Sequence, residues 1–263
     1  MSEALVPAGA GQTAITSTNA TVAAKIAAMQ QASKFTVELF TQIGGSSFRF
    51  LPQLRLYASN SKDVVMGKIG GSHYGIYRKK DQPLEDLSKE TLVVLIAYRA
   101  KAMWLKAKPP ISHFNSASEE YRKIVATQAD KTQKETGAAH GPEFLVWIPK
   151  TASRDGLLAT FFMGGESARN NSGAVQSFLP SSDGKFFPCV LFSSVIQKPE
   201  KNQVWIVPEA RPSQQEVELP PEKTLDDALT FFLNPKDSEV TSDEADDSAT
   251  GGAVDPAKLN ADR

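Results

Sequence analysis

Apolar residues recur along the chain in short runs, and their spacing predicts a fold built mainly of strands. The longest run, at 91–104, is continuously apolar at its start and becomes basic and aromatic toward its end, which is typical of a buried strand that reaches solvent. Shorter runs predict a glycine-rich hairpin at 64–78 and strands at 47–58, 144–149, 157–163, 186–197 and 202–209.

Helical spacing separates some of these strands. Asn19 can cap an amphipathic helix in which Val22, Ile26 and Met29 recur on one face, and which packs on the core or on a partner. Further helices are predicted at 117–133, at 166–178 and, before Pro235, at 224–234.

The order of these elements predicts an α+β, mainly β fold. Five strands, at 47–58, 91–104, 157–163, 186–197 and 202–209, with a helix between the third and the fourth, match the element order of an OB-fold, a five-stranded Greek-key barrel. The hairpin at 64–78 and the segment 108–150 would then be insertions. Other β-rich folds also contain six or seven short strands, so this order does not single out the OB-fold.

The composition divides the chain further. We expect a disordered N-terminus at 1–19, the amphipathic helix within 20–43, an OB-like domain at 44–212, a linker with a short helix at 213–235 and a disordered acidic tail at 236–263. From Asp237 to Asp255 there are seven acids and no Lys or Arg. Such a stretch buries too little apolar area to offset the entropy of ordering.

Charge is distributed unevenly. From Arg49 to Lys123 there are 14 basic and 7 acidic residues, a balance of +7, whereas from Glu216 to Arg263 there are 13 acids and 4 bases, a balance of −9. This asymmetry predicts a nucleic acid or another anionic partner for the basic part.

Candidate catalytic and metal-binding chemistry is sparse. Cys189 is the only cysteine and lies in an apolar run, so we expect a buried, inert thiol and a reducing compartment. His73, His113 and His140 have no paired spacing that would hold a metal. The turn at Gly164-Gly165 lacks the Lys-Ser/Thr ending of a phosphate-binding loop. We therefore expect no enzyme, no metal and no cofactor.

The chain is expected to be cytoplasmic. Its first 20 residues have neither the basic start nor the apolar stretch of a secretory signal, and its longest apolar runs are too short to span a bilayer.

The informative pattern is basic residues interleaved with aromatic ones. Single-strand binding requires cations for the phosphates and flat rings on which bases stack. The rival interpretation is that the rings fill the core while the cations only solubilise the surface. The candidate nucleic-acid-binding residues are Arg49, Arg55, Tyr57, Lys68, Tyr74, Tyr77, Arg78, Tyr98, Arg99, Lys101, Trp104, Lys106 and Arg169.

With GPEFLVWIPK at 141–150, LLATFFMGGESAR at 157–169 and the acidic tail, the chain resembles single-stranded DNA-binding proteins of tailed bacteriophages, a divergent OB-fold group. Over about residues 45–211 the resemblance lies in the arrangement of the elements, and in the tail it lies in the acidic composition. It implies that a basic and aromatic barrel face binds the strand without strong sequence preference. The positions matched to that role are Arg55, Tyr98, Arg99, Lys101 and Arg169.

The resemblance also implies that the tail competes for the binding face and recruits replication or recombination proteins. The regulatory acids would be Asp237, Glu239, Asp243, Glu244, Asp246 and Asp247. Tails of this group commonly finish with an aromatic residue, whereas this sequence finishes in DPAKLNADR, so the apolar segment Leu229–Leu233 could supply the partner contact instead.

Three functions follow from these patterns. The first is single-stranded DNA binding in phage replication or recombination, with possible homo-oligomers and no membrane. The second is a phage virion or scaffold protein, which would assemble without nucleic acid. The third is an enzyme acting on nucleotides through the glycine turn, for which the sequence offers neither a base nor a metal ligand.

Overall fold

The structure is a computed structural model that describes residues 15–16, 51–78, 82–107, 111–130, 137–165, 171–181, 184–198, 203–233 and 238–239. Several expectations fall outside these residues. They are the helix at 20–43, the N-terminus apart from residues 15 and 16, the tail beyond Glu239, and the candidate residues Arg49 and Arg169.

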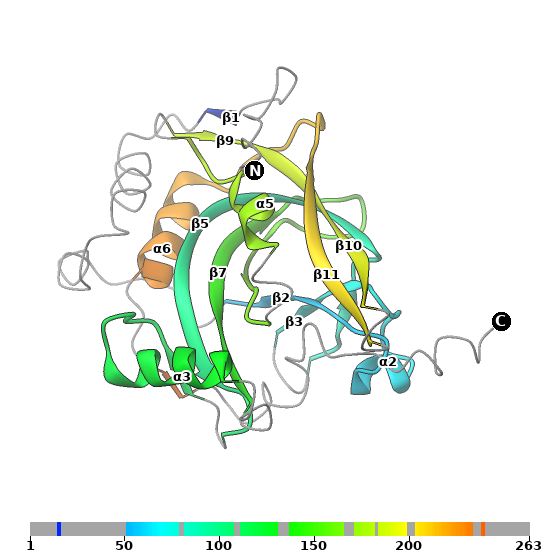
Figure 1. The fold of residues 1–263 in the computed structure, drawn as a ribbon. Coiled ribbons are helices and arrows are strands. Elements are labelled where there is room, and N and C mark those ends of the chain that lie inside the picture. The colour runs from blue at the N-terminus through cyan, green and yellow to red at the C-terminus, as the bar shows by residue number, and fades with distance from the viewer. Residues whose placement is uncertain are drawn as a thin grey trace, which may run out of the picture.

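Strands are the commonest regular element of the described chain (Figure 1). The strands are β1 (Ile15–Thr16), β2 (Gln53–Leu56), β3 (Tyr74–Tyr77), β4 (Glu85–Asp86), β5 (Glu90–Trp104), β6 (Ile111–His113), β7 (Ala138–Ile148), β8 (Leu157–Phe162), β9 (Lys185–Phe186), β10 (Pro188–Lys198), β11 (Gln203–Pro212) and β12 (Ser238–Glu239). The helices are α2 (Lys62–Val65), α3 (Glu119–Ala129), α5 (Ser172–Gln176) and α6 (Glu222–Leu233).

One mixed sheet organises the molecule, with the strand order β11-β10-β5-β7-β8-β2-β3-β4. The pairing of β2 with β8 is parallel, and its other described pairs are antiparallel. The sheet curls into a half-barrel (Figure 1). Two side-chain bonds bring its distant parts together: the Tyr74 hydroxyl donates to the Phe192 carbonyl at 3.0 Å, and the Ser193 hydroxyl donates to the Ser72 carbonyl at 3.1 Å.

The two faces of the sheet carry separate apolar cores. On the inner face, side chains such as Leu54, Ile76 and Phe161 pack together. On the outer face, α6 covers β5, β7 and β8 because its buried residues recur at helical spacing. These helix residues are Leu225, Ala228, Leu229 and Phe232.

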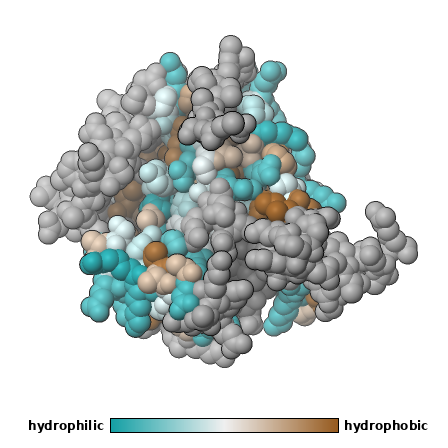
Figure 2. Space-filling model, in the orientation of Figure 1, coloured by the Kyte–Doolittle hydropathy of each residue, from teal (hydrophilic) through white to brown (hydrophobic). Residues whose placement is uncertain are grey.

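The surface of the face drawn in Figure 2 is mixed. It is mostly polar around α3 and has an apolar patch over part of β10 and β11. Val195 on β10 has 57% of its surface exposed.

Most predicted elements are confirmed. The structure has strands at 90–104, 157–162, 188–198 and 203–212 and helices at 119–129 and 222–233, all within a few residues of the predictions. The fold class, mainly β with short helices, is therefore confirmed. The helix predicted at 166–178 is shorter in the described part and spans Ser172–Gln176.

The strand pairing does not confirm the OB assignment. The segment at 47–58, of which β2 forms part, pairs with β3 and β8 and not with β5. Both presumed insertions contribute strands to the sheet, since β7 lies at its centre and β3 pairs with β2 near one edge. The hairpin region also contains α2, because Ser61 accepts a hydrogen bond from the Val64 amide and caps a helical turn.

Two segments expected outside the folded domain contact it. The helix α6, predicted as part of a linker region, packs in the outer-face core. The start of the acidic tail, Ser238–Glu239, pairs as β12 with β6.

Candidate nucleic-acid interface

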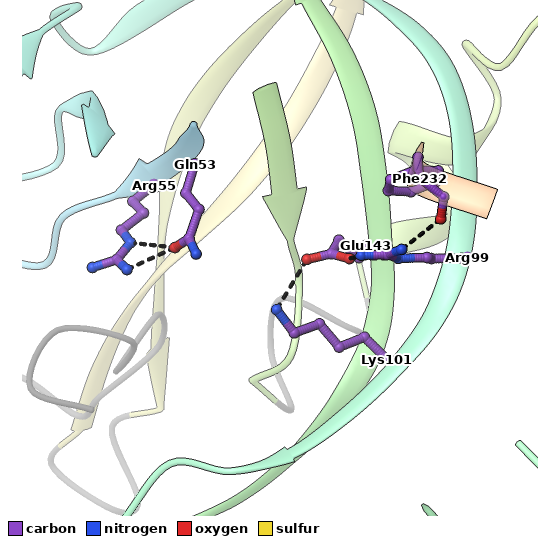
Figure 3. Close-up of polar contacts among 6 residues, drawn as sticks. All are labelled: Gln53, Arg55, Arg99, Lys101, Glu143 and Phe232. Carbon is purple, nitrogen blue, oxygen red and sulfur yellow. Dashed lines mark hydrogen bonds and ion pairs between the residues drawn. The ribbon is translucent and has the colours of Figure 1, made fainter. Parts of the chain in front are cut away.

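A row of side chains crosses the outer face of the sheet at the end of α6. Arg99 on β5 lies opposite Glu143 on β7, and Glu143 lies opposite Phe162 on β8. Because Leu54 pairs with Phe161 in parallel register, the next position places Phe162 beside Arg55 on β2. We call Arg55, Arg99, Lys101, Glu143 and Phe162 the outer-face row. In Figure 3, β8 lies between Arg55 on one side and Arg99, Lys101 and Glu143 on the other.

Glu143 anchors the row by binding two cations. The Arg99 Nε donates to one carboxylate oxygen at 2.7 Å, and the Lys101 Nζ donates to the other at 3.0 Å (Figure 3). Burial of Glu143 acts to raise the pKa of its carboxyl, but the charges and hydrogen bonds of Arg99 and Lys101 outweigh burial and lower that pKa. Glu143 is therefore held as a carboxylate with little contact with water.

Arg99 joins three elements through its planar guanidinium. Its centre lies 3.9 Å from the Phe114 ring centroid and 4.3 Å from that of Phe232, so the group lies against both rings. Its Nη1 donates to the Phe232 carbonyl. That carbonyl lies in the last turn of α6, where carbonyls lack helical partners and where positive charge is favourable. Arg99 therefore stabilises the end of α6.

Lys101 lies between two half-buried rings. Its ammonium is 5.0 Å from the Phe162 ring centroid and 5.9 Å from that of Phe114. Gly164 accommodates the Phe162 ring, because a β-carbon at Gly164 would lie 2.2 Å from the ring. The helix α3 contacts the same segment, since the Gln128 side chain donates to the Gly164 carbonyl at 3.0 Å.

Arg55 is the least compensated cation of the row. Its side chain is buried, with 8% of the residue exposed, and lies 4.0 Å from the Tyr77 ring centroid. Its Nε and Nη2 both donate to the Gln53 amide oxygen, while its Nη1 is buried without a hydrogen-bond partner. Within the described chain no carboxylate pairs with Arg55, and a buried charge in that position is costly.

The row therefore carries excess positive charge beside aromatic rings. Three cations (Arg55, Arg99, Lys101) and one carboxylate (Glu143) leave a balance of +2. An anion that accepted the unpaired guanidinium N–H would relieve that imbalance. The neighbouring rings of Phe114, Phe162 and Tyr77 are half-buried and offer apolar faces.

The structure divides the predicted residues between the two faces of the sheet. All of Arg55, Tyr77, Arg99 and Lys101 lie on the outer face, with Arg55 and Tyr77 on one side of β8 and Arg99 and Lys101 on the other. Tyr98 packs against the inner core, and alternation along β5 directs Trp104 to the same inner face. Tyr57 and Tyr74 are almost completely buried, so neither offers a ring face to a base in this conformation.

The remaining predicted cations have other surroundings. Lys68 pairs with Asp63 at 2.7 Å on the surface, and Lys106 is exposed after the end of β5. Arg78 pairs with Glu85 at 2.7 Å, away from the row. Binding of DNA by any of these residues stays a prediction.

Sequence reasoning missed Glu143, Phe114 and Phe162. A signal for Glu143 was present, since it is a lone acid at the head of an apolar run, EFLVWI, and such an acid usually has a buried cationic partner. The contribution of Phe162 follows from the alternation of LLATFF once Phe161 is assigned to the core. Phe114 has no comparable signal, because its position depends on the path of the chain after β6.

Other chemistry finds little support in the described residues. Burial raises the pKa of the Cys189 thiol to about 12, which makes it a poor nucleophile at neutral pH. His113 and His140 flank Ala102 on neighbouring strands, yet the described part of the chain brings no three His, Cys, Asp or Glu residues together as a metal site.

Comparisons of the chain with family models, with curated proteins and with solved structures found no match. Over the described residues, no helix combines the length and the apolar character needed to cross a membrane.

Proposed function

We propose that this protein binds single-stranded DNA without strong sequence preference and that the outer-face row is its contact surface. The observation that carries the proposal is the surplus of two positive charges in the row, with the buried, unpaired Nη1 of Arg55, beside half-buried aromatic rings. Cations next to ring faces are the combination that single strands require.

In this proposal the phosphates and the bases contact different groups. Phosphate oxygens bind Lys101 and Arg55, which flank β8. Bases stack on the rings of Phe162, Phe114 and Tyr77, each stacked base contributing about 1–3 kcal/mol. Stacking and phosphate contacts read no base edge, so they tolerate any sequence.

Access to these cations requires local movement. Lys101 is 6% exposed, and the rings that flank it are those of Phe114 and Phe162. A strand therefore reaches the ammonium only when these rings turn outward, which would also free them for stacking.

The half-barrel would then serve as an OB-like platform, and the acidic tail as its competitor. β12, at the start of the tail, pairs with β6, and β6 leads directly to Phe114. The tail acids would occupy the cations when DNA is absent and would bind replication or recombination proteins when DNA displaces them. The cytoplasm of a phage-infected host is the compartment that fits this function.

The experiment is fluorescence anisotropy of a labelled oligo-dT strand, titrated with the full chain from low to moderate salt with unlabelled duplex as competitor. We expect binding that duplex does not displace. The logarithm of the binding constant should fall linearly with the logarithm of salt concentration, with a slope of about −0.7 for each phosphate neutralised.

Variants test the row itself. Arg55→Gln and Lys101→Gln should each weaken binding and reduce the slope by about 0.7, and Phe162→Leu should weaken binding with the slope unchanged. Lys123→Gln is the matched control, because Lys123 lies on α3 with 63% of its side chain exposed. Circular dichroism melts check that each variant is folded.

Two results would contradict the proposal. The first is no binding at low salt. The second is binding that Arg55→Gln and Lys101→Gln leave unchanged while both variants stay folded. Stable assembly of the chain without DNA would then favour the virion or scaffold protein.

A further inference from the structure

A second group of cations lies at the other end of β8 from Phe162. Arg154 lies in the turn between β7 and β8, and Arg78 follows β3. Both bind Glu85 on β4: the Arg78 Nη2 lies 2.7 Å from one carboxylate oxygen, and the Arg154 Nε lies 3.2 Å from the other. Glu85 therefore links the hairpin of β3 and β4 to the turn before β8.

Arg154 is held in place by its own turn. Thr151 and Arg154 form an isolated bridge, in which the Thr151 amide donates to the Arg154 carbonyl at 2.8 Å. The Arg154 Nη2 donates to the Pro149 carbonyl at 2.9 Å. Its Nη1 is buried and has no hydrogen-bond partner. The guanidinium is thus oriented by protein groups while one of its donor nitrogens stays unused.

The cluster also has too little negative charge. Glu85 is one carboxylate shared by two guanidinium groups, which leaves a balance of +1. The pKa of Arg154 is lowered because burial disfavours its charge and because Arg78 repels it, although Glu85 acts in the opposite direction. An additional anion would supply the missing charge and accept the unused N–H.

We infer that Arg78, Glu85 and Arg154 form an anion site that takes a phosphate group, bound by the Nη1 of Arg154 and by Arg78. A guanidinium presents planar donors that match phosphate oxygens, and two guanidinium groups can share the several oxygens of one phosphate. Because the Nη1 is buried, a phosphate reaches it only when the turn moves, and the turn residues Thr151, Ala152 and Ser153 are exposed.

This site is separate from the outer-face row, and the inference does not rest on the proposed function. Alternation along β3 directs Arg78 to the face of Ile76, the inner face, whereas Tyr77 lies with Arg55 on the outer face. The phosphate can come from a DNA strand or from a free phosphate compound, and the experiment distinguishes these two sources.

The first arm measures thermal unfolding of the full chain with increasing inorganic phosphate, at ionic strength held constant with sodium chloride. A ligand that binds only the folded state raises the melting temperature, by an amount that grows with the logarithm of its concentration relative to its dissociation constant. We expect stabilisation by phosphate and less by acetate, whose single carboxylate offers fewer oxygens. The Arg154→Gln variant should lose affinity for phosphate by about tenfold or more.

Two further variants make the result specific. Lys150→Gln is the matched control in the same turn, since Lys150 is exposed and pairs with Asp155 only at 3.8 Å; it should respond to phosphate like the parent chain. Glu85→Gln should bind phosphate more tightly, because the competing carboxylate is gone. Each variant is compared with itself, through the change in its melting temperature on adding phosphate. A general loss of stability therefore does not produce the expected difference.

The second arm measures oligo-dT binding by the same variants. If the phosphate belongs to a strand, Arg154→Gln reduces the salt slope by about 0.7 and inorganic phosphate competes with the oligonucleotide. If the phosphate belongs to a free compound, Arg154→Gln leaves oligonucleotide binding unchanged but abolishes the rise in melting temperature that phosphate causes. A phosphate shift that depends on Arg154 in a chain that binds no DNA would refute the proposed function and leave this site intact.

One pattern would overturn the inference. It is an equal response to phosphate in the parent chain and in Arg154→Gln, or no response in either. The unused N–H would then be satisfied by water alone.

Discussion

Glu143 is the residue on which the outer-face row depends, because it is the carboxylate that lies between Arg99 and Lys101. Replacing it with Gln keeps the shape but leaves two cations without a counter-charge. Loss of one partner of a buried ion pair costs about 3–5 kcal/mol.

We therefore expect Glu143→Gln to lower the free energy of unfolding by about that amount, measured by urea denaturation. Glu120→Gln is the control, since Glu120 is exposed on α3 and pairs with Lys123 at 3.5 Å; its effect should stay within about 0.5 kcal/mol. Equal effects of the two substitutions would show that the row is not a stabilising unit.

Acid should destabilise the protein through two residues. Burial acts to raise the pKa of the Asp86 carboxyl, but hydrogen bonds from Ser88, His73 and Gly70 lower it below 3.8, and the pKa of Glu143 lies below 4.5 for the reasons given above. A lowered folded-state pKa gives stability that is present above the unfolded-state value and is lost as pH falls through the folded-state value.

Unfolding free energy should therefore decrease as pH falls below about 4, and Glu143→Gln should flatten this acid limb. The measurement is urea denaturation at a series of pH values. An acid limb of the same steepness in Glu143→Gln would contradict the assignment.

At the scale of elements, the close approach of β7 and β8 sets a sharp steric limit. A β-carbon at Gly141 would lie 2.0 Å from the Met163 carbonyl oxygen, which is backbone and cannot rotate away. Gly141→Ala must therefore separate the strands near the row. Overpacking of this kind typically costs about 1–3 kcal/mol.

The matched control is Gly173→Ala on α5, where nothing lies within 4 Å of the added carbon. Because alanine favours helix, this change should be neutral or stabilise by up to about 1 kcal/mol. Thermal denaturation compares the two variants. A Gly141→Ala chain as stable as the parent would mean that the strands separate without loss.

Strand positions could be predicted from the sequence, but which side chains of β5 point to each face of the sheet could not. Val93 and Leu95 point into the inner core, and unbroken alternation would put Arg99 and Lys101 there as well. The register between β5 and β7 shifts between Leu95 and Ala97, so later odd-numbered residues face outward. Nothing in the apolar run TLVVLIAY marks that bulge.

Strand neighbours were equally hard to predict. The apolar run of β7 was visible, yet its central position depends on pairings with β5 and β8 that arise from the curl of the whole sheet. The parallel contact of β2 with β8 joins segments about 100 residues apart, and it is this contact that brings Arg55 to Phe162. Local periodicity carries no signal for such a pairing.

For the whole molecule, the separation of charge along the sequence suggests how binding could be controlled. The basic span from Arg49 to Lys123 contains three cations of the outer-face row, and the acids follow α6, whose last turn Arg99 binds. The chain entering the tail thus starts next to the row, and β12 keeps Ser238–Glu239 beside β6. Acids tethered at this point can interact with the cations of the row at low salt without fixed contacts.

We accordingly expect deletion of residues 237–263 to tighten binding of oligo-dT, most clearly at low salt, where screening is weakest. Anisotropy titrations of the full and shortened chains measure the effect. The deletion also removes β12, so a second variant keeps the full length and replaces the tail acids with Asn and Gln.

Tightening in both variants would show that charge is the cause, because the neutral tail can still pair with β6. Tightening in the deletion alone would assign the effect to β12 and to its contact with β6. Equal affinity of all three chains would refute competition by the tail, while leaving the cations and rings of the row as the contact surface.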